Sequence, residues 1–150
     1  MTEEISWANT VEFVPIVNGG KVIKVYDCDT ITIACKIPYS ETIAESNIVY
    51  RFHIRLLGID SPEIKSRDAN DKTIAILARD RLSMMILHKN VTLKNKSIDK
   101  YGRILANVVT EDGIDLSSWA LRERYAVPYN GGAKVRPKDW VIFHELGFRE

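Results

Sequence analysis

The chain has 150 residues and a mass of 17.1 kDa, which is enough for one compact domain and too little for two of ordinary size. Hydrophobic residues at 45% and charged residues at 27% exclude intrinsic disorder and a fibrous repeat as a description of the whole chain. The net charge of +1 excludes the strong positive field of proteins that hold duplex DNA non-specifically, so any contact with a polyanion must be local.

The sequence also disfavours a membrane protein or a secreted protein. No apolar run approaches the roughly 20 residues that a bilayer-spanning helix needs, and the segment Met1 to Glu4 is acidic where a signal peptide would be basic. Cys28 and Cys35 are separated by a turn and its outgoing strand, which exceeds the reach of a disulfide unless the chain folds back. Because free thiols are typical of a reducing compartment, we expect an intracellular protein without a membrane partner.

The N-terminal third predicts short strands. Residues 1–18 show no clear period and are expected to form a tail or a first edge strand. Two β-branched runs, 22–26 and 31–35, flank a turn at 27–30 and predict a hairpin. Residues 37–49 are poorly periodic, and we expect them to form an inserted arm between strands.

A regular alternation of apolar and polar residues at 50–56 predicts a third strand, which runs on to Ile59 and stops at Pro62. Arg55 lies on the polar side of this alternation and is expected to point away from the core. Apolar residues at helical spacing then predict one long helix from about Asp71 to His88.

The rest of the chain predicts two more strands, a loop and two shorter helices. The strands are expected at 91–93 and 104–109, the loop at 127–132, and the helices at about 116–124 and 137–148. Together these elements indicate a mainly β protein with α-helices (α+β), namely a five-stranded OB-type β-barrel with about three helices. We expect residues 1–150 to form this single domain.

Polar residues cluster at the turns and strand ends of this scheme, at 27–30, Arg55, 60–63 and 100–103. Each cluster alone has a structural explanation, since Asp and Thr in a hairpin turn usually cap backbone amides. In combination they offer what metal-assisted phosphodiester hydrolysis requires. Few carboxylates around a hard cation leave room for water and a phosphate oxygen. Arg55 and Arg103 are the candidates that would pair with phosphate oxygens.

Three of these segments resemble, in order, the active-site blocks of the staphylococcal nuclease (thermonuclease) family: DCDT at 27–30, RLLGIDSPE at 55–63 and DKYGR at 99–103. The resemblance covers about residues 20–127. It implies an OB-type barrel that cleaves DNA and RNA with Ca²⁺ and leaves 3′-phosphate ends.

The resemblance also implies which residues hold the metal. Asp29 and Asp60 correspond to the calcium carboxylates, and Ser61 stands where the family lends a main-chain carbonyl to the ion. Asp27 corresponds to an acid behind these ligands, and Thr30 to a residue that orients it.

Further matches imply the catalytic and substrate-binding residues. Glu63 stands where the family's glutamate positions or deprotonates the attacking water. Arg55 and Arg103 correspond to the pair that binds the scissile phosphate, with Arg103 nearer the leaving oxygen. Lys100 and Tyr101 correspond to side chains that hold a flanking phosphate.

The sequence departs from the family in a few places. Cys28 replaces the glycine usual between the two aspartates, and a positive φ there would strain the turn by roughly 1 kcal/mol or more. The match fades past Tyr125, and Tyr129 on the following glycine-rich loop is the candidate for base stacking. His53, His88 and His144 never approach a metal-ligand spacing and are expected to be structural or at the surface.

These observations predict a monomeric, calcium-dependent endonuclease with DNA and RNA as substrates. We expect a preference for single strands, because a small basic site on a near-neutral body does not easily distort a duplex. The alternative is a catalytically silent nuclease-like module that binds nucleic acid or protein, although such modules typically lose the acidic and arginine positions kept here. A purely structural ion site would leave Arg55 and Arg103 unexplained.

Overall fold

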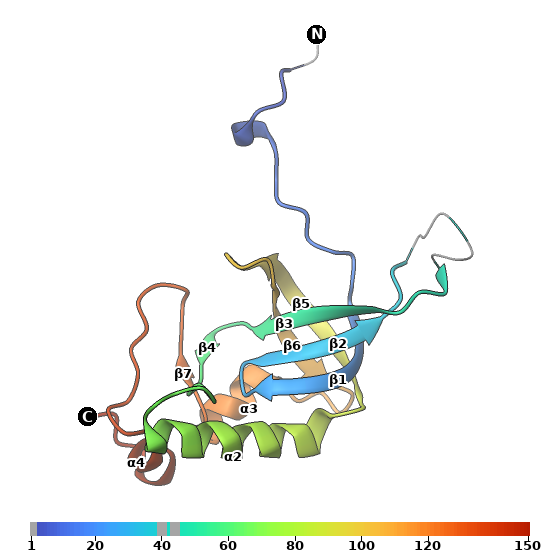
Figure 1. Cartoon of the computed structure of the whole chain (residues 1–150). Helices are drawn as coiled ribbons and strands as arrows, with labels where there is room; N and C mark the ends of the chain where they lie inside the picture. Colours follow the sequence, from blue (N-terminus) through green and yellow to red (C-terminus); the bar gives the residue numbers. More distant parts are fainter. Residues whose placement is uncertain (1–2, 39–41, 43–45) are drawn as a thin grey trace.

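The computed structural model describes residues 3–38, 42 and 46–150 (Figure 1). Five strands close into a barrel in the order β1-β2-β3-β6-β5. All neighbouring pairs are antiparallel except β3 and β6, which run parallel. The strands are β1 Gly19–Asp27, β2 Thr30–Cys35, β3 Tyr50–Leu56, β5 Asn90–Ile98 and β6 Ile104–Thr110. The closed five-stranded barrel, with the helices α2, α3 and α4 among the described residues, confirms the predicted OB-type α+β architecture.

The register of the first three strands brings polar residues together at one end of the barrel. Asp27 pairs with Thr30 across the predicted hairpin turn, and Thr30 pairs with Arg55 on β3. Directly opposed residues in antiparallel strands have Cβ atoms roughly 5 Å apart. The hairpin and the third strand therefore place an acid, a hydroxyl and a guanidinium in one row.

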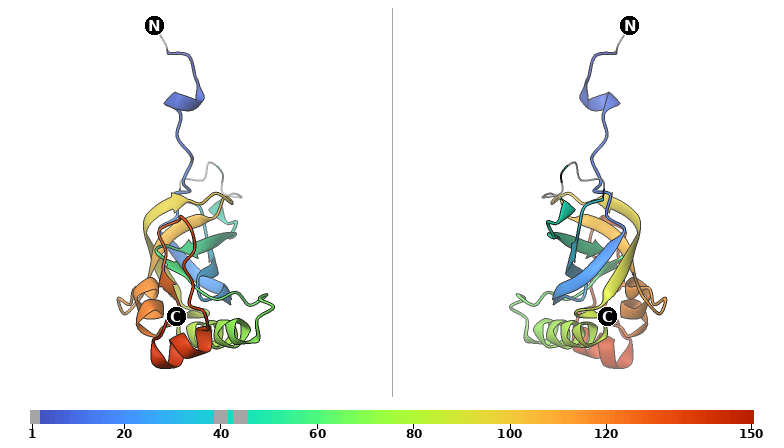
Figure 2. Two further views of the ribbon diagram at one scale, coloured as in Figure 1. Left: turned by 90° about the vertical axis from the view of Figure 1, so that its left-hand side faces the viewer. Right: turned by 90° about the vertical axis from the view of Figure 1, so that its right-hand side faces the viewer.

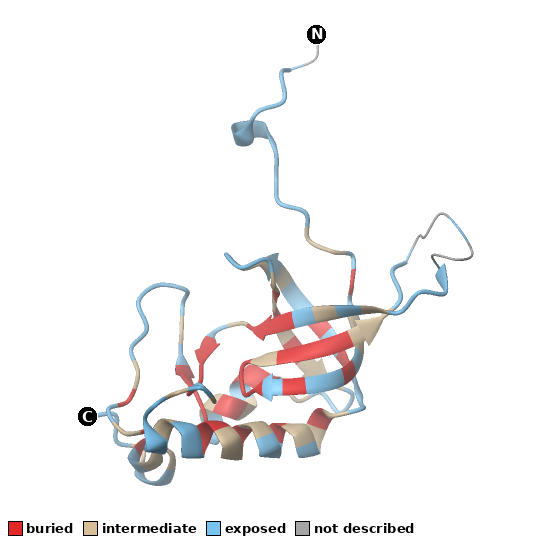
Figure 3. Cartoon of the chain, viewed as in Figure 1, coloured by how far each residue is buried: buried red, intermediate tan, exposed pale blue. Residues whose placement is uncertain are grey.

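Helix α2, Ala69–Ile86, packs against the barrel with one apolar face (Figures 1 and 3). The buried residues Ile74, Ala78, Leu82 and Ile86 recur every four positions, which is the spacing that predicted this helix. Its N-terminus is capped by Asp68, whose carboxylate accepts hydrogen bonds from two backbone N–H groups of the first turn. Each buried leucine or isoleucine contributes about 1.5–3 kcal/mol to the free energy of unfolding.

Two short helices complete the fold. Helix α3, Leu116–Arg122, packs on β6, and helix α4, Trp140–Leu146, packs on α2. Asp139 caps α4 and also accepts a hydrogen bond from the side-chain amide of Asn70 at 2.7 Å, which ties the starts of α2 and α4 together. Helix α4 ends at Gly147, whose φ of 81° suits glycine.

One predicted loop is in part a strand. Val127–Pro128 forms β7, which pairs antiparallel with β4, Ile59–Asp60. The prediction of a loop throughout 127–132 was wrong here because a strand of two residues is too short to show an alternation of apolar and polar residues. Pro128 is tolerated because it lies on an edge strand, where the missing N–H is not needed. The pairing anchors Asp60 and the chain that follows β7.

The N-terminal residues extend away from the barrel (Figures 1 and 2). They contain the short 3₁₀ helix η1, Trp7–Asn9, and the described part of 1–18 contains no strand. The course of the predicted arm at 37–49 stays a prediction, since 39–41 and 43–45 lie outside the described residues. In the part of the chain that is described, no helix combines the length and the apolar character needed to cross a bilayer.

Candidate active site

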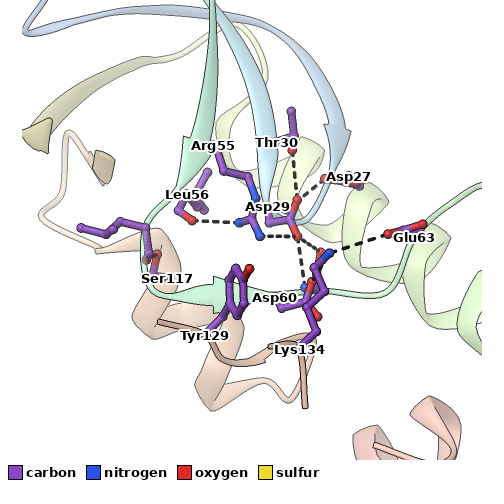
Figure 4. Close-up of polar contacts among 12 residues, drawn as sticks. Asp27, Asp29, Thr30, Arg55, Leu56, Asp60, Glu63, Ser117, Tyr129 and Lys134 are labelled. Carbon is purple, nitrogen blue, oxygen red and sulfur yellow. Dashed lines mark hydrogen bonds and ion pairs between the residues drawn. The ribbon is translucent and has the colours of Figure 1, made fainter. Parts of the chain in front are cut away.

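A polar cavity of about 350 Å³ opens at the barrel end where β1, β2 and β3 meet β4. It brings together residues of all three sequence blocks, although they are far apart along the chain. Figure 4 shows how those of the first two blocks meet. The predicted residues that line it are Asp27, Asp29, Thr30, Arg55, Asp60, Ser61, Glu63, Tyr101 and Arg103. The cavity thus combines carboxylates that can hold a cation with guanidinium groups that can hold an anion.

Asp29 is the most heavily bonded acid in the cavity. Its Oδ2 accepts hydrogen bonds from the Ser61 hydroxyl at 2.8 Å and the Ser61 backbone N–H at 3.1 Å, and it lies 3.5 Å from Nη2 of Arg55. The Thr30 hydroxyl donates to Oδ1 at 3.0 Å, so Thr30 orients Asp29 rather than Asp27. Burial alone would raise the pKa of Asp29, but the charge of Arg55 and the hydrogen bonds with Asp27 and Ser61 outweigh it and lower the pKa. Asp29 is therefore a fixed carboxylate.

Asp27 has the opposite electrostatic character. Its Oδ1 accepts a hydrogen bond from the backbone N–H of Asp29 at 3.1 Å. Burial, and then the negative charge of Asp29, raise the pKa of Asp27 to about 8. Near neutral pH Asp27 therefore keeps its proton beside the ionised Asp29. A cation bound by Asp29 would offset the negative charge that helps to raise the pKa of Asp27.

Arg55 faces the cavity from β3. Its Nη1 donates to the carbonyl of Leu56 at 2.9 Å, while Nη2 contacts Asp29. The alternation correctly placed Arg55 opposite the core-facing Ile54 and Leu56. The guanidinium is nevertheless buried, because Asp29 and the Leu56 carbonyl take up its charge in place of water.

The loop after β7 supplies two cations that the sequence analysis missed. Arg136 donates to both oxygens of Asp60, at 2.9 and 3.3 Å, and to Oε1 of Glu63 at 3.1 Å. Lys134 lies 3.5 Å from Asp60. Asp60 is only 2% exposed, whereas Glu63 is 57% exposed at the cavity rim. The only signal in the sequence was a pair of basic residues two positions apart behind a glycine-rich turn.

Arg103 is held by the turn between β5 and β6. Its Nε donates to Asp99 Oδ2 at 2.7 Å, while Asp99 Oδ1 accepts from the backbone N–H groups of Tyr101 and Arg103, both at 2.9 Å. Burial would raise the pKa of Asp99, but these hydrogen bonds outweigh it and lower the pKa. The guanidinium carbon lies 5.4 Å from the centre of the Tyr101 ring. The turn therefore presents Arg103 in a defined orientation.

A second cavity of about 360 Å³ adjoins the first and shares Arg55, Tyr101, Arg103 and Lys134 with it. The remaining predicted substrate-binding residues, Lys100 and Tyr129, line this second cavity. The Tyr129 hydroxyl donates to the carbonyl of Gly132 at 3.0 Å, which fixes the ring at the mouth of the loop. Two aromatic rings beside cations suit a flat base and its phosphate.

Three of the expectations from the sequence concern the backbone at Cys28, the state of the cysteines and the place of the histidines. Among the described non-glycine residues, only His88, Asn95 and Arg124 have positive φ, so the strain considered for Cys28 is not present. The Cys28 side chain instead fills the core, and both cysteines are free thiols as predicted. None of the three histidines lines either cavity.

The residues of the cavity fit a hard divalent cation for which the protein would supply only some of the ligands. Asp29 and Asp60 offer carboxylate oxygens, and the contacts of Arg136 and Lys134 with Asp60 show that this position favours positive charge. Among residues 3–38, 42 and 46–150, no three His, Cys, Asp or Glu side chains are grouped as metal ligands. A cation bound here would therefore depend on main-chain, water or substrate oxygens for its remaining ligands.

Comparisons with known proteins agree with this geometry. Residues 53–141 match the family described as "Staphylococcal nuclease homologue". A protein named "Uncharacterized endonuclease" from Escherichia coli is 31% identical over 110 residues, covering 73% of this chain and 60% of its own. "Probable endonuclease LCL3" from Yarrowia lipolytica is 35% identical over 114 residues, covering 73% of this chain and 50% of its own. The chain thus spans 60% or less of these relatives. Because the family match extends over more than half of its residues, the chain belongs to the staphylococcal nuclease homologue family.

Proposed function

We propose that the chain is a calcium-dependent endonuclease that hydrolyses phosphodiester bonds of DNA and RNA, prefers single strands, leaves 3′-phosphate ends and acts as a monomer. The observation that carries this proposal is the single cavity that gathers the acids and arginines of three separate sequence blocks. The names of two relatives, which both contain the word endonuclease, support the same reaction class.

The acids at the centre of the cavity would hold the ion. Asp29 and Asp60 would bind Ca²⁺ together with the main-chain carbonyl of Ser61, while the Ser61 hydroxyl keeps Asp29 in position. Bound there, the ion would polarise a phosphate oxygen and offset the charge that grows during hydrolysis. Arg136 would have to release Asp60, since it contacts both carboxylate oxygens.

The other residues of the cavity would act on water and phosphate. Glu63, exposed at the rim, would orient the attacking water or accept its proton, which typically contributes about 10²- to 10⁴-fold in rate. Arg55 and Arg103 would pair with the phosphate oxygens, with Arg103 nearer the leaving oxygen. Because Asp29 and Asp99 orient the two guanidinium groups before substrate arrives, their attraction can grow with the charge of the transition state.

The second cavity would hold the flanking nucleotide. Lys100 and Tyr101 would contact its phosphate, and Tyr129 would stack on its base. A base can enter such a cavity only when it is unstacked from its neighbours, and this requirement favours single-stranded or frayed substrate. Cleavage of matched single- and double-stranded oligonucleotides tests this step, and a preference for duplex would contradict it.

The reaction is tested by the release of acid-soluble nucleotides with Ca²⁺ and with EDTA. The variants Glu63→Gln and Arg103→Ala should each reduce release by about 10²-fold or more. Glu111→Gln and Arg122→Ala, which change exposed residues outside both cavities, are matched controls and should keep the wild-type rate. Activity that survives EDTA would refute the metal requirement, and equal activity with Mg²⁺ would refute the choice of Ca²⁺.

A second candidate is a silent module that binds nucleic acid or protein. It is favoured by the ion pairs of Arg136 and Lys134, which occupy the acids that the reaction would need. Wild-type protein that binds an oligonucleotide but releases no nucleotides with Ca²⁺ or Mg²⁺ would establish this function in place of the nuclease.

A further inference from the structure

The face of β3 that carries Arg55 continues beyond the cavity. Residues two apart on a strand share a face, so Arg51, His53 and Arg55 lie in one line along β3. Arg55 belongs to the cavity, whereas Arg51 and His53 are exposed and line neither cavity. The proposed function leaves these two residues without a role.

The strand register adds cations from β1 beside them. Arg51 pairs with Ala34 on β2, and Ala34 pairs with Lys21 on β1. In the next row His53 pairs with Thr32, which pairs with Lys24. Strands are spaced about 4.8 Å apart, so the outer members of each row lie on the order of 10 Å from each other. Two rows of basic side chains therefore cross the outer surface of β1, β2 and β3, which lie side by side in Figure 1.

An aromatic side chain connects these rows to the cavity. Tyr26 lines the cavity wall and is 39% exposed. Lys24 Nζ lies 5.9 Å from the centre of the Tyr26 ring, within the range of a cation–π contact. From the row of Thr30 to the row of Ala34, β2 rises by roughly 13 Å. The basic rows are thus continuous with the cavity and extend it in one direction.

The charges on this face are not neutralised by the described parts of the protein. Within residues 3–38, 42 and 46–150, Lys21, Lys24 and Arg51 make no ion pair, whereas Arg55, Arg103, Lys134 and Arg136 all do. The only carboxylate on β1, β2 and β3 is Asp27, which is buried in the cavity. An exposed face with one sign of charge attracts a polyanion.

We infer that Lys21, Lys24, Tyr26, Arg51 and His53 form a track that holds single-stranded nucleic acid beside the bond cleaved in the cavity. The inference rests on the proposed function for the nature of the strand. OB-type barrels bind single strands in grooves that combine cations with stacking aromatic rings, typically over roughly 4 to 16 nucleotides. A duplex would need a wider surface, because its two strands present phosphates on both sides of the helix.

The test measures binding in EDTA, which prevents cleavage, by fluorescence anisotropy with labelled DNA. The probes are a single strand of about twelve nucleotides and a dinucleotide, of which only the longer can reach from the cavity along the track. The double variant Lys24→Gln/Arg51→Gln is compared with Lys72→Gln/Arg122→Gln, which removes two exposed cations from helices α2 and α3.

The track predicts that Lys24→Gln/Arg51→Gln loses on the order of tenfold in affinity for the long strand, while the dinucleotide is affected much less. The slope of log affinity against log salt should fall by about 1.4, which corresponds to two phosphate contacts on a single strand. The control variant should bind both probes within twofold of wild type. Since both substitutions are at exposed positions, thermal unfolding should be unchanged.

Other results separate the track from the proposed function. Equal losses for the two double variants, or equal losses for long and short probes, would overturn the track even if wild-type protein cleaves DNA. With a duplex of the same length as a third probe, a greater loss for the duplex than for the single strand would also overturn it. Wild-type protein that binds through the track but does not cleave with Ca²⁺ would support the track and refute the proposed nuclease.

Discussion

The two sides of the cavity are built differently. On the barrel side, Asp29 and Arg55 belong to the β1–β2 turn and β3, both are buried, and each makes hydrogen bonds in addition to their shared ion pair. On the loop side, Glu63 and Arg136 belong to irregular segments that follow the two-residue strands β4 and β7. The Arg136 side chain is 29% exposed. The barrel thus carries the charges that must keep their positions, and the loop carries charges that can change partners.

The two sides of the cavity should also differ in how much their ion pairs contribute to the free energy of unfolding. Removing one partner of a buried ion pair typically costs about 3–5 kcal/mol, because the remaining charge is left without compensation. An exposed pair contributes roughly 0–1 kcal/mol. Substitutions on the barrel side should therefore reduce both stability and activity, whereas those on the loop side should change binding and activity with little effect on folding.

Arg55→Gln should have the largest effect. It leaves Asp29 buried without its cation, so we expect the free energy of unfolding to fall by about 3 kcal/mol in urea titrations and cleavage to fall by about 10²-fold or more. Arg79→Gln, which breaks an exposed pair with Asp80, is the control and should cost less than about 1 kcal/mol. Equal stability losses for the two variants would show that the barrel side is not the rigid one.

Asp99→Asn should have an intermediate effect that depends on pH. The native state lowers the pKa of Asp99, so its charged form stabilises the fold above the unfolded pKa of about 4, and this contribution is lost as pH falls through the native pKa. We expect the substitution to cost about 1–2 kcal/mol at pH 7 and progressively less below pH 4. Urea titrations of both proteins between pH 3 and 7 measure the difference, and a gap that widens toward low pH would contradict this account.

Arg136→Gln should have the smallest effect on stability, about 1 kcal/mol, because Lys134 stays 3.5 Å from the buried Asp60 and compensates its charge when the Arg136 hydrogen bonds are lost. In contrast, Ca²⁺ should bind several-fold more tightly, since the guanidinium no longer competes for the Asp60 oxygens. Titration calorimetry measures the affinity without relying on cleavage. Weaker binding would mean that Arg136 supports the metal site, and the contrast between the two sides would then be wrong.

Much of the fold could be predicted from local pattern. The strands at 50–56 and 104–109 and the long helix were predicted within a few residues, because alternation and four-residue spacing follow directly from burial of one face. The end of the long helix was predicted less accurately than its middle. The helix was expected to reach His88, but α2 ends at Ile86, and His88 has a φ of 66°, which is outside the helical range. Strand β7 was missed because its pairing with β4 depends on a contact between distant segments.

The predicted site residues illustrate the same division. Asp29, Arg55 and Asp60 could be identified because each lies in a recognisable block, and the structure places them around one cavity. Thr30 was predicted to orient Asp27 but donates to Asp29, because a hydroxyl can reach either neighbouring acid and only the tertiary structure distinguishes them. Arg136 has no distinctive neighbours in the sequence, and its role depends on how the loop returns to Asp60.

By itself the sequence determined the chemistry available to this protein and the order of its strands, because side-chain type and burial period are local properties. Only the tertiary structure decided which charges meet: that Ser61 and Thr30 hold Asp29, that Arg136 covers Asp60 and Glu63, and that the outer face of β1–β3 joins the cavity. Ion pairs and hydrogen bonds form over a few ångströms in space, and the chain separation of the partners carries no information about that distance.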